Sequence, residues 1–83
     1  MEADRAVLEK IIEILQPFVA DSVKIVPEMD MESDLSIDSL KSMEILAGLE
    51  DAFDISIPIN VLSEVRTVED LAVQIQKVVE AEG

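Results

Sequence analysis

The stretch DLSIDSLKSMEILAGLEDAF, residues 34–53, decides the fold of this chain. Asp38 is a good N-cap residue, because its carboxylate can accept a hydrogen bond from a backbone N–H of the first helical turn. Apolar residues then recur about every fourth position, which is the spacing of a buried helix face: Ile45, Leu46, Leu49 and Phe53. The stretch therefore predicts a helix that begins after Asp38 and ends at about Phe53.

A second, shorter apolar row lies on the same predicted helix, at Leu40, Met43 and Ala47. One neighbouring layer of structure cannot easily cover both rows of a single helix. We therefore expect one row to stay exposed and available to a partner. The alternative is that both rows belong to the core.

Toward the N-terminus, apolar residues at steps of three and four predict an amphipathic helix over about residues 4–17, with Pro17 in its fraying end. Residues 19–38 contain Pro27 and many Asp, Glu and Ser residues, which argue against a continuous helix. Apolar residues interspersed in this segment can fasten it to the core: Val23, Ile25, Val26, Met29, Leu35 and Ile37. A long ordered loop is expected there.

Toward the C-terminus, Pro58 interrupts the chain and a short helical turn is expected over residues 59–64. Thr67 then caps a final helix, with Asp70 three positions later in a capping-box-like arrangement. The expected fold is an all-α bundle of three principal helices and one short helix, with a long first loop. The length predicts a single domain over residues 1–83.

The chain contains no cysteine and no histidine, which excludes disulfides, thiolate catalysis and a serine–histidine dyad. Lys41 lies two residues from Ser39, on another side of the helix, so no serine–lysine dyad is credible either. An EF-hand counted from Asp30 fails, since its sixth and twelfth positions hold Leu35 and Lys41. We expect neither an enzyme nor a dedicated metal site.

The net charge of −13 limits the classes of molecule that this chain can bind. Nine acids and one base lie between Glu28 and Asp54, so nucleic acid and anionic membrane surfaces would be repelled. No apolar run is long enough to span a membrane, and the acidic start resembles no targeting signal. These features predict a cytoplasmic monomer that binds basic patches on other proteins.

Few positions can carry covalent chemistry, and Ser39 stands out among them. A serine at the first helical position is exposed, and backbone N–H groups next to it lack partners within the helix. A phosphate attached there would meet those donors and the positive end of the helix dipole. The tripeptide Asp38-Ser39-Leu40 is common by itself, and ordinary helix capping is its usual explanation.

In context, the chain resembles the acyl carrier protein family over nearly its whole length. Asp34-Leu35-x-x-Asp38-Ser39-Leu40 is similar to the attachment motif of that family, and Leu49-Glu50-x-x-Phe53 to its second helix. Ile57-Pro58 matches the turn before its short third helix, and Thr67-Val68 matches the start of its last helix. The resemblance implies a 4′-phosphopantetheine arm on Ser39, installed by a phosphopantetheinyl transferase from coenzyme A with magnesium. The arm would hold acyl groups as thioesters for partner enzymes of fatty-acid, lipid or polyketide-type biosynthesis.

The resemblance also assigns residues around Ser39. Those near the arm are Asp38, Leu40 and, as a candidate phosphate contact, Lys41, where the family usually has an acid. The partner-binding surface is implied at Asp38, Leu40, Glu44, Ala47, Glu50 and Asp51. Ser36 replaces a glycine common in the family, and residues 59–64 are more apolar than usual. These departures suggest a specialised carrier. The alternatives are an aminoacyl or peptidyl carrier and an unmodified acidic helical adaptor.

Overall fold

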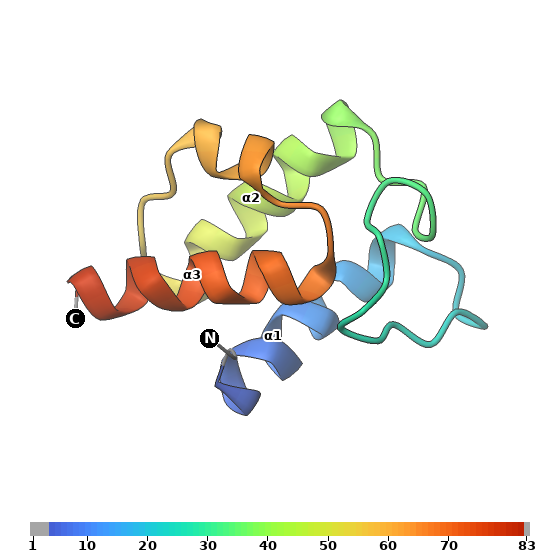
Figure 1. Ribbon diagram of the computed structural model, residues 1–83, viewed down its shortest axis with the longest axis horizontal. Helices are drawn as coiled ribbons and strands as arrows, with labels where there is room; N and C mark the ends of the chain where they lie inside the picture. Colours follow the sequence, from blue (N-terminus) through green and yellow to red (C-terminus); the bar gives the residue numbers. More distant parts are fainter. Residues whose placement is uncertain (1–3, 83) are drawn as a thin grey trace.

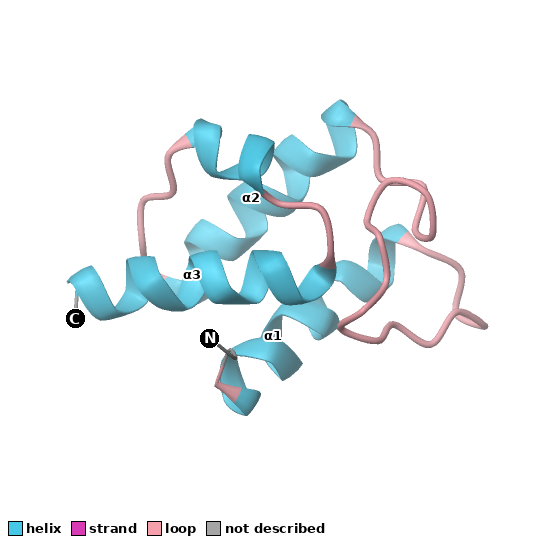
Figure 2. Cartoon of the chain, in the orientation of Figure 1, coloured by secondary structure: helices cyan, strands magenta, loops and turns pink. Residues whose placement is uncertain are grey.

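The computed structural model describes residues 4–82, which form three α-helices and two short 3-10 helices. In chain order these are α1 (Arg5–Leu15), η1 (Gln16–Phe18), α2 (Ser39–Phe53), η2 (Ile59–Glu64) and α3 (Val68–Glu82). Figures 1 and 2 show α1 packed below α3, α2 behind α3, and a long loop at one end of the bundle. The predicted all-α bundle of three principal helices and a short one is confirmed. The 3-10 turn at η1 was not predicted.

The first helix is shorter than predicted. Its N-cap is Asp4, whose side chain accepts a hydrogen bond of 2.9 Å from the N–H of Ala6. The α-helix ends at Leu15, and Pro17 lies in the first turn of η1. The helical segment predicted to about residue 17, with Pro17 in its fraying end, thus changes to a 3-10 turn after Leu15, because proline has no N–H and its ring obstructs the preceding α-helical turn. A 3-10 turn accommodates it.

Helix α2 begins and ends close to the predicted residues, and α3 begins where predicted, after Thr67. Asp38 caps α2, and Asp54 ends it in the left-handed conformation at φ 54°. At the start of α3, the N–H of Asp70 donates to Oγ1 of Thr67 and the N–H of Thr67 donates to the Asp70 carboxylate, both at 3.1 Å. The predicted capping box is confirmed.

The core is wholly apolar: among the described residues no polar or charged side chain is buried. The side chains with the least exposure come from all three α-helices, and α1 packs against both α2 and α3. Gly48 of α2 faces Ile14 of α1, and a Cβ at Gly48 would lie at an ordinary contact distance of 3.5 Å from Cγ2 of Ile14. The buried α-helical residues are Ile11, Leu15, Ile45, Leu46, Leu49, Val68, Leu71, Ala72 and Ile75.

The long loop between η1 and α2 is ordered, as expected, because it contributes to the core and is fastened to α3. Its buried side chains are Ile25, Met31, Leu35 and Ile37. The Gln16 side-chain amide donates to the carbonyls of Ala20 and Val23, at 3.3 and 3.1 Å. Residues 27–31 lie along residues 66–69, where three backbone hydrogen bonds of 2.9–3.1 Å join Met31 to Arg66, Val68 to Met29 and Glu69 to Pro27.

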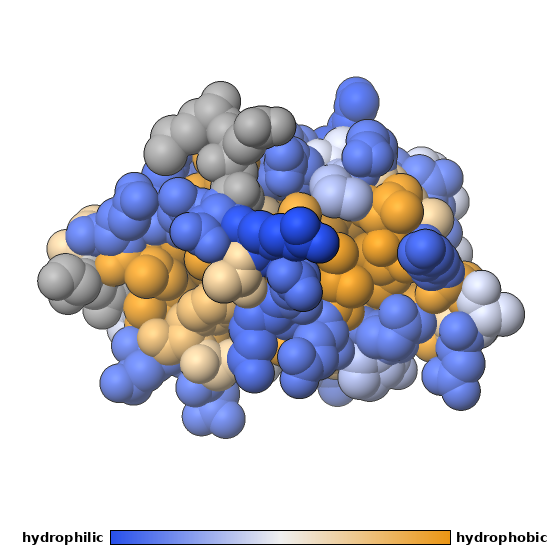
Figure 3. Space-filling view, turned by 90° about the horizontal axis from the view of Figure 1, so that it is seen from below, coloured by the Kyte–Doolittle hydropathy of each residue, from blue (hydrophilic) through white to orange (hydrophobic). Residues whose placement is uncertain are grey.

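Apolar side chains also remain on the surface. Figure 3, a view from below, shows two apolar areas separated by hydrophilic side chains. A small domain cannot cover all its apolar surface, so such areas are ordinary. Within residues 4–82, three large apolar side chains are more than half exposed: Leu40 at 70%, Met43 at 53% and Ile59 at 63%. The prediction that one apolar row of α2 stays exposed is confirmed, and that row is Leu40, Met43 and Ala47.

We find no helix within residues 4–82 with the length and apolar character needed to cross a membrane.

Candidate functional site

Ser39 is the first residue of α2 and is exposed at the end of that helix. The N-cap carboxylate of Asp38 accepts a hydrogen bond of 2.9 Å from the N–H of Lys41. Within residues 4–82, the N–H groups of Ser39 and Leu40 have no acceptor, which is usual for the first turn of a helix. Two backbone donors are therefore open beside the Ser39 hydroxyl, at the positive end of the helix dipole.

The residues before Ser39 turn so that the serine is exposed while the chain next to it is anchored. Ser36 has φ 56°, in the left-handed region that residues other than glycine rarely adopt. The side chain of Ile37 is 4% exposed, and its N–H donates to the Met31 carbonyl at 2.9 Å. Ile37 thus fixes the loop to the core, and Asp38 and Ser39 follow on the surface.

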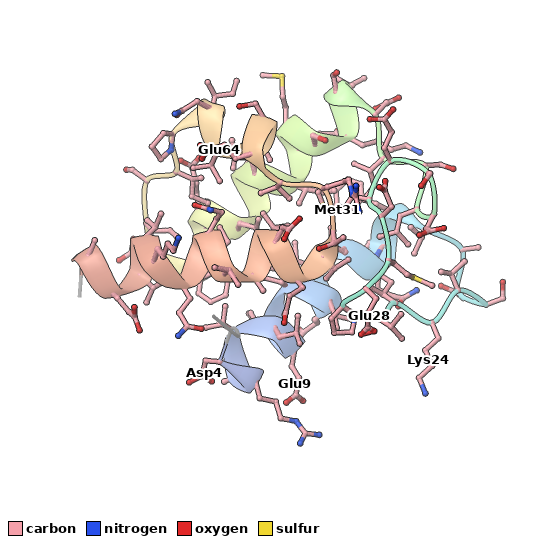
Figure 4. All side chains as sticks on the ribbon, viewed as in Figure 1. Asp4, Glu9, Lys24, Glu28, Met31 and Glu64 are labelled. Atoms are coloured by element: carbon pink, nitrogen blue, oxygen red, sulfur yellow. The ribbon has the colours of Figure 1, made fainter. Side chains whose placement is uncertain are left out.

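A groove with a volume of about 940 Å³ begins at Ser39. One wall is the long loop, the second is the first half of α2, and the third is η2 with the residues that follow it. Met31 comes from the loop and lies beside the segment that joins η2 to α3 (Figure 4). The groove is lined by Asp30, Met31, Glu32, Ser33, Ile37, Asp38, Ser39, Ser42, Met43, Ile59, Leu62, Ser63, Val65 and Arg66.

Two of the four residues predicted for the arm line this groove, namely Asp38 and Ser39. Leu40 does not line it and is 70% exposed. Lys41 is half-buried, lies outside the lining, and forms no ion pair within the described part of the chain. The structure therefore brings Asp38 and Ser39 together at the groove and leaves the other two outside it.

The residues predicted for partner binding fall into two groups. Five are exposed: Asp38, Leu40, Glu44, Ala47 and Asp51. Glu50 is half-buried, and its carboxylate accepts a hydrogen bond of 2.8 Å from the N–H of Ile57. Glu50 thus has a role inside the fold that its position in the family pattern did not indicate.

Asp30 and Arg66 belong to the groove and were not predicted. Nε of Arg66 lies 3.6 Å from Oδ2 of Asp30, while Oδ1 of Asp30 accepts the N–H groups of Glu32 and Ser33 at 2.9 Å. The hydrogen bond from the Ser33 backbone is the main cause that holds the pKa of Asp30 below its usual value, and Arg66 adds a smaller effect. An aspartate at the start of a turn is a recognisable signal, but nothing in the sequence pairs Asp30 with Arg66.

Two acids of the loop, Asp30 and Asp34, bind backbone donors. The Asp34 carboxylate accepts the N–H of Asp30 at 2.8 Å, and Asp30 itself caps the following turn. Among the residues that the structure describes, no group of three or more Asp, Glu, His or Cys side chains is placed to hold a metal ion.

Comparison with known proteins gives a consistent result. A family model described as "Phosphopantetheine attachment site" matches residues 5–75. An acyl carrier protein of Thermobifida fusca (strain YX) is 32% identical over 76 residues, which are 90% of this chain and 96% of that protein. One of Thermosynechococcus vestitus is 36% identical over 67 residues, 75% of this chain and 83% of that protein. A probable acyl carrier protein of Caulobacter vibrioides is 45% identical over 51 residues, 61% and 59% of the two chains.

Proposed function

This chain belongs to the family of acyl carrier proteins, and from that premise we propose that Ser39 bears the 4′-phosphopantetheine arm as a phosphodiester. The observation that carries the proposal is an exposed hydroxyl at the first position of α2 with two unpaired backbone N–H groups beside it. Such donors and the helix dipole favour a phosphate at that point. The donor set at Ser39 therefore fits the group.

The arm supplies the thiol on which acyl groups are held as thioesters. The chain itself has no cysteine, and no histidine that could activate Ser39 as a nucleophile. Its proposed part is to present Ser39 and to dock partner enzymes, over one domain that spans residues 1–83. We propose a carrier that performs no acyl chemistry with its own side chains.

Attachment requires Oγ of Ser39 to form a bond with the phosphorus of coenzyme A nearest the pantetheine. The P–O bond of the diphosphate breaks, and the nucleotide part leaves with the bonding electron pair. We propose that the hydroxyl proton passes to a base of the enzyme that catalyses the transfer. A phosphopantetheinyl transferase with magnesium is the enzyme proposed for this step. Asp38, exposed next to Ser39, is proposed to help dock it and orient its metal.

We propose that partners dock on the exposed side of α2, at Asp38, Leu40, Glu44, Ala47 and Asp51. Glu50 contributes less to this surface, because one of its carboxylate oxygens accepts the hydrogen bond from Ile57. With a net charge of −13, this surface suits basic patches on enzymes that transfer or modify acyl groups. Each exposed ion pair is worth roughly 0.2–1 kcal/mol, which suits a carrier that must dissociate quickly. Fatty-acid, lipid or polyketide-type biosynthesis by a cytoplasmic monomer is the proposed setting.

Lys41 is the exception on this acidic helix, and we propose that it selects partners by charge mismatch or contacts the phosphate. The first role predicts that Lys41→Asp raises turnover by enzymes of a general fatty-acid synthase. Equal turnover of wild type and Lys41→Asp would contradict the charge-mismatch role.

The test of the proposed function is intact mass after incubation with a broad-specificity phosphopantetheinyl transferase, coenzyme A and magnesium. Wild type should gain one phosphopantetheine, and Ser39→Ala should gain nothing. Ser42→Ala is the matched control, since Ser42 lies one turn later in the same groove, and it should be modified like wild type. No gain by a folded wild type, with a known carrier modified in parallel, would favour the unmodified adaptor.

A further inference from the structure

Arg66 has a fixed backbone and an accessible side chain. Its N–H donates to the Asp70 carboxylate at 3.2 Å, and its carbonyl accepts the N–H of Met31 at 2.9 Å. The side chain lines the groove that begins at Ser39 and is 82% exposed. The fold therefore sets where the guanidinium is presented without burying it.

Most of the donor capacity of that guanidinium is unused. A guanidinium has five N–H donors in a planar fork, and within residues 4–82 the ion pair with Asp30 is made through Nε alone, at 3.6 Å. That distance is longer than a good charge-assisted hydrogen bond. The two terminal nitrogens are thus available to acceptors in the groove.

The other charged groups of the lining do not compete for the same ligand. Asp30 and Asp38 accept backbone N–H groups, and Glu32 offers only acceptors at neutral pH. Among the described residues that line the groove, Arg66 is the one cation. Apolar side chains form much of the remaining wall, namely Met31, Ile37, Met43, Leu62 and Val65.

We propose that Arg66 is a positioning residue that donates hydrogen bonds to a carbonyl or carboxylate oxygen of the group carried at Ser39. The inference rests on the proposed function, because that function puts an acceptor-rich arm and its acyl cargo at the mouth of this groove. The oxygen could belong to an arm amide or to an oxygenated acyl group such as a 3-oxoacyl chain, and the chemistry is the same in both cases. Arg66 would then favour one orientation of the loaded group over others.

The pair with Asp30 offers a selective control. Asparagine at position 30 keeps an oxygen for the N–H groups of Glu32 and Ser33, but replaces Oδ2, the atom that faces Arg66. Asp30→Asn therefore frees the guanidinium while it keeps the turn. A purely structural Arg66 would make Asp30→Asn and Arg66→Ala behave alike. A positioning Arg66 makes them differ.

The experiment compares apo protein with the holo, hexanoyl and 3-oxohexanoyl forms, each verified by intact mass. The first readout is the NMR chemical shift of the Arg66 Nε–H, which should move on loading in wild type and in Asp30→Asn. A shift that moves in the holo and hexanoyl forms assigns the acceptor to the arm, and one that moves only in the 3-oxohexanoyl form assigns it to the cargo. Either result supports the proposal.

The second readout is the rate at which hydroxylamine cleaves the thioester of the acylated form, hexanoyl or 3-oxohexanoyl, that shows the shift. We expect that rate to change about fivefold in Arg66→Ala, the factor for the net contribution of one hydrogen bond, and less in Arg66→Lys. The cleavage rate of Asp30→Asn should equal that of wild type, or differ from it in the opposite direction to the rate of Arg66→Ala. Lys77→Ala, which removes an exposed cation of α3, is the matched charge control and should match wild type.

Two results would overturn the inference while the proposed function stands: loading confirmed by mass with no movement of the Nε–H signal in any form, or equal cleavage rates in wild type and Arg66→Ala. Failure of wild type to load at all would overturn the proposed function, and the inference with it.

Discussion

The two sides of the groove are held in different ways. On the loop–α3 side, residues 27–31 are joined to residues 66–69 by three backbone hydrogen bonds, and the carboxylates of Asp30 and Asp70 cap the turns next to them. On the α2–η2 side, no described hydrogen bond joins Ile59–Glu64 to Ser39–Phe53. There the hydrogen bond from Ile57 N–H to Glu50 ties the preceding linker to α2.

This difference indicates which side of the groove can move. Backbone hydrogen bonds between two segments are lost together when the segments separate, whereas packed side chains can shift with smaller losses. We infer that the loop–α3 side keeps Ser39 and Arg66 in register, and that η2 is the wall that adjusts to what the groove holds. Four predictions test the comparison.

The largest effect should come from a pair of isoleucines on opposite walls. Ile37 is 4% exposed and Ile59 is 63% exposed, although both line the groove. Ile37→Ala should lower the free energy of unfolding by about 2–5 kcal/mol, since it opens a cavity, and Ile59→Ala by less than about 0.5 kcal/mol. Urea unfolding at pH 7 measures both. Similar losses in the two variants would show that the walls are equally built into the core.

The next effect concerns the tie on the α2–η2 side. Glu50→Ala leaves the partly buried N–H of Ile57 without its acceptor, which should cost about 1–3 kcal/mol. Glu50→Gln keeps a side-chain oxygen and should lose less. Hydrogen exchange of the Ile57 amide should become faster in Glu50→Ala, and Asp51→Ala, at an exposed neighbour, should leave that exchange unchanged. Unaltered exchange in Glu50→Ala would mean that η2 is held by packing alone.

Sequence reasoning succeeded where the deciding contacts are local. The caps at Asp38 and Thr67 and the exposed row that starts at Leu40 depend on residues within four positions of one another, so spacing alone indicated them. The Arg66–Asp30 and Ile57–Glu50 contacts join different segments. No periodicity encodes such contacts, because they depend on how the segments pack.

Ser36 lies between these two cases. The sequence singled it out as a serine in a position where the family has glycine, but gave no physical reason for the glycine. The structure supplies one, since φ is 56° at Ser36 and a side chain is disfavoured in that region. The same conformation at Asp54 ends α2, where glycine or asparagine is the common choice.

The third prediction follows from that backbone conformation. Ser36→Gly should stabilise the protein by about 0.5–1 kcal/mol, because it relieves the left-handed conformation on the loop–α3 side. Ser22→Gly is the matched control in the same loop, at an exposed residue without positive φ, and should destabilise by a similar amount. Thermal unfolding of the two variants measures whether each one is more or less stable than wild type. A loss of stability in Ser36→Gly would contradict the assigned conformation.

The smallest effect is the response of the loop–α3 side to acid. The hydrogen bond from the Thr67 backbone is the main cause that lowers the pKa of Asp70 below its usual value, and the Arg66 N–H acts in the same direction. A carboxyl with a lowered folded pKa stabilises the fold above its unfolded value of about 3.9, and this stability is lost as the pH falls through the folded pKa. The drop in urea midpoint from pH 7 to pH 3 should therefore be smaller in Asp70→Asn than in wild type.

Glu64→Gln is the control from the opposite wall, since Glu64 is an exposed carboxylate of η2 (Figure 4). It should keep the full wild-type drop. If Asp70→Asn and Glu64→Gln reduce the drop equally, the acid response reflects the overall negative charge, and the carboxylate caps give the loop–α3 side no special share in it.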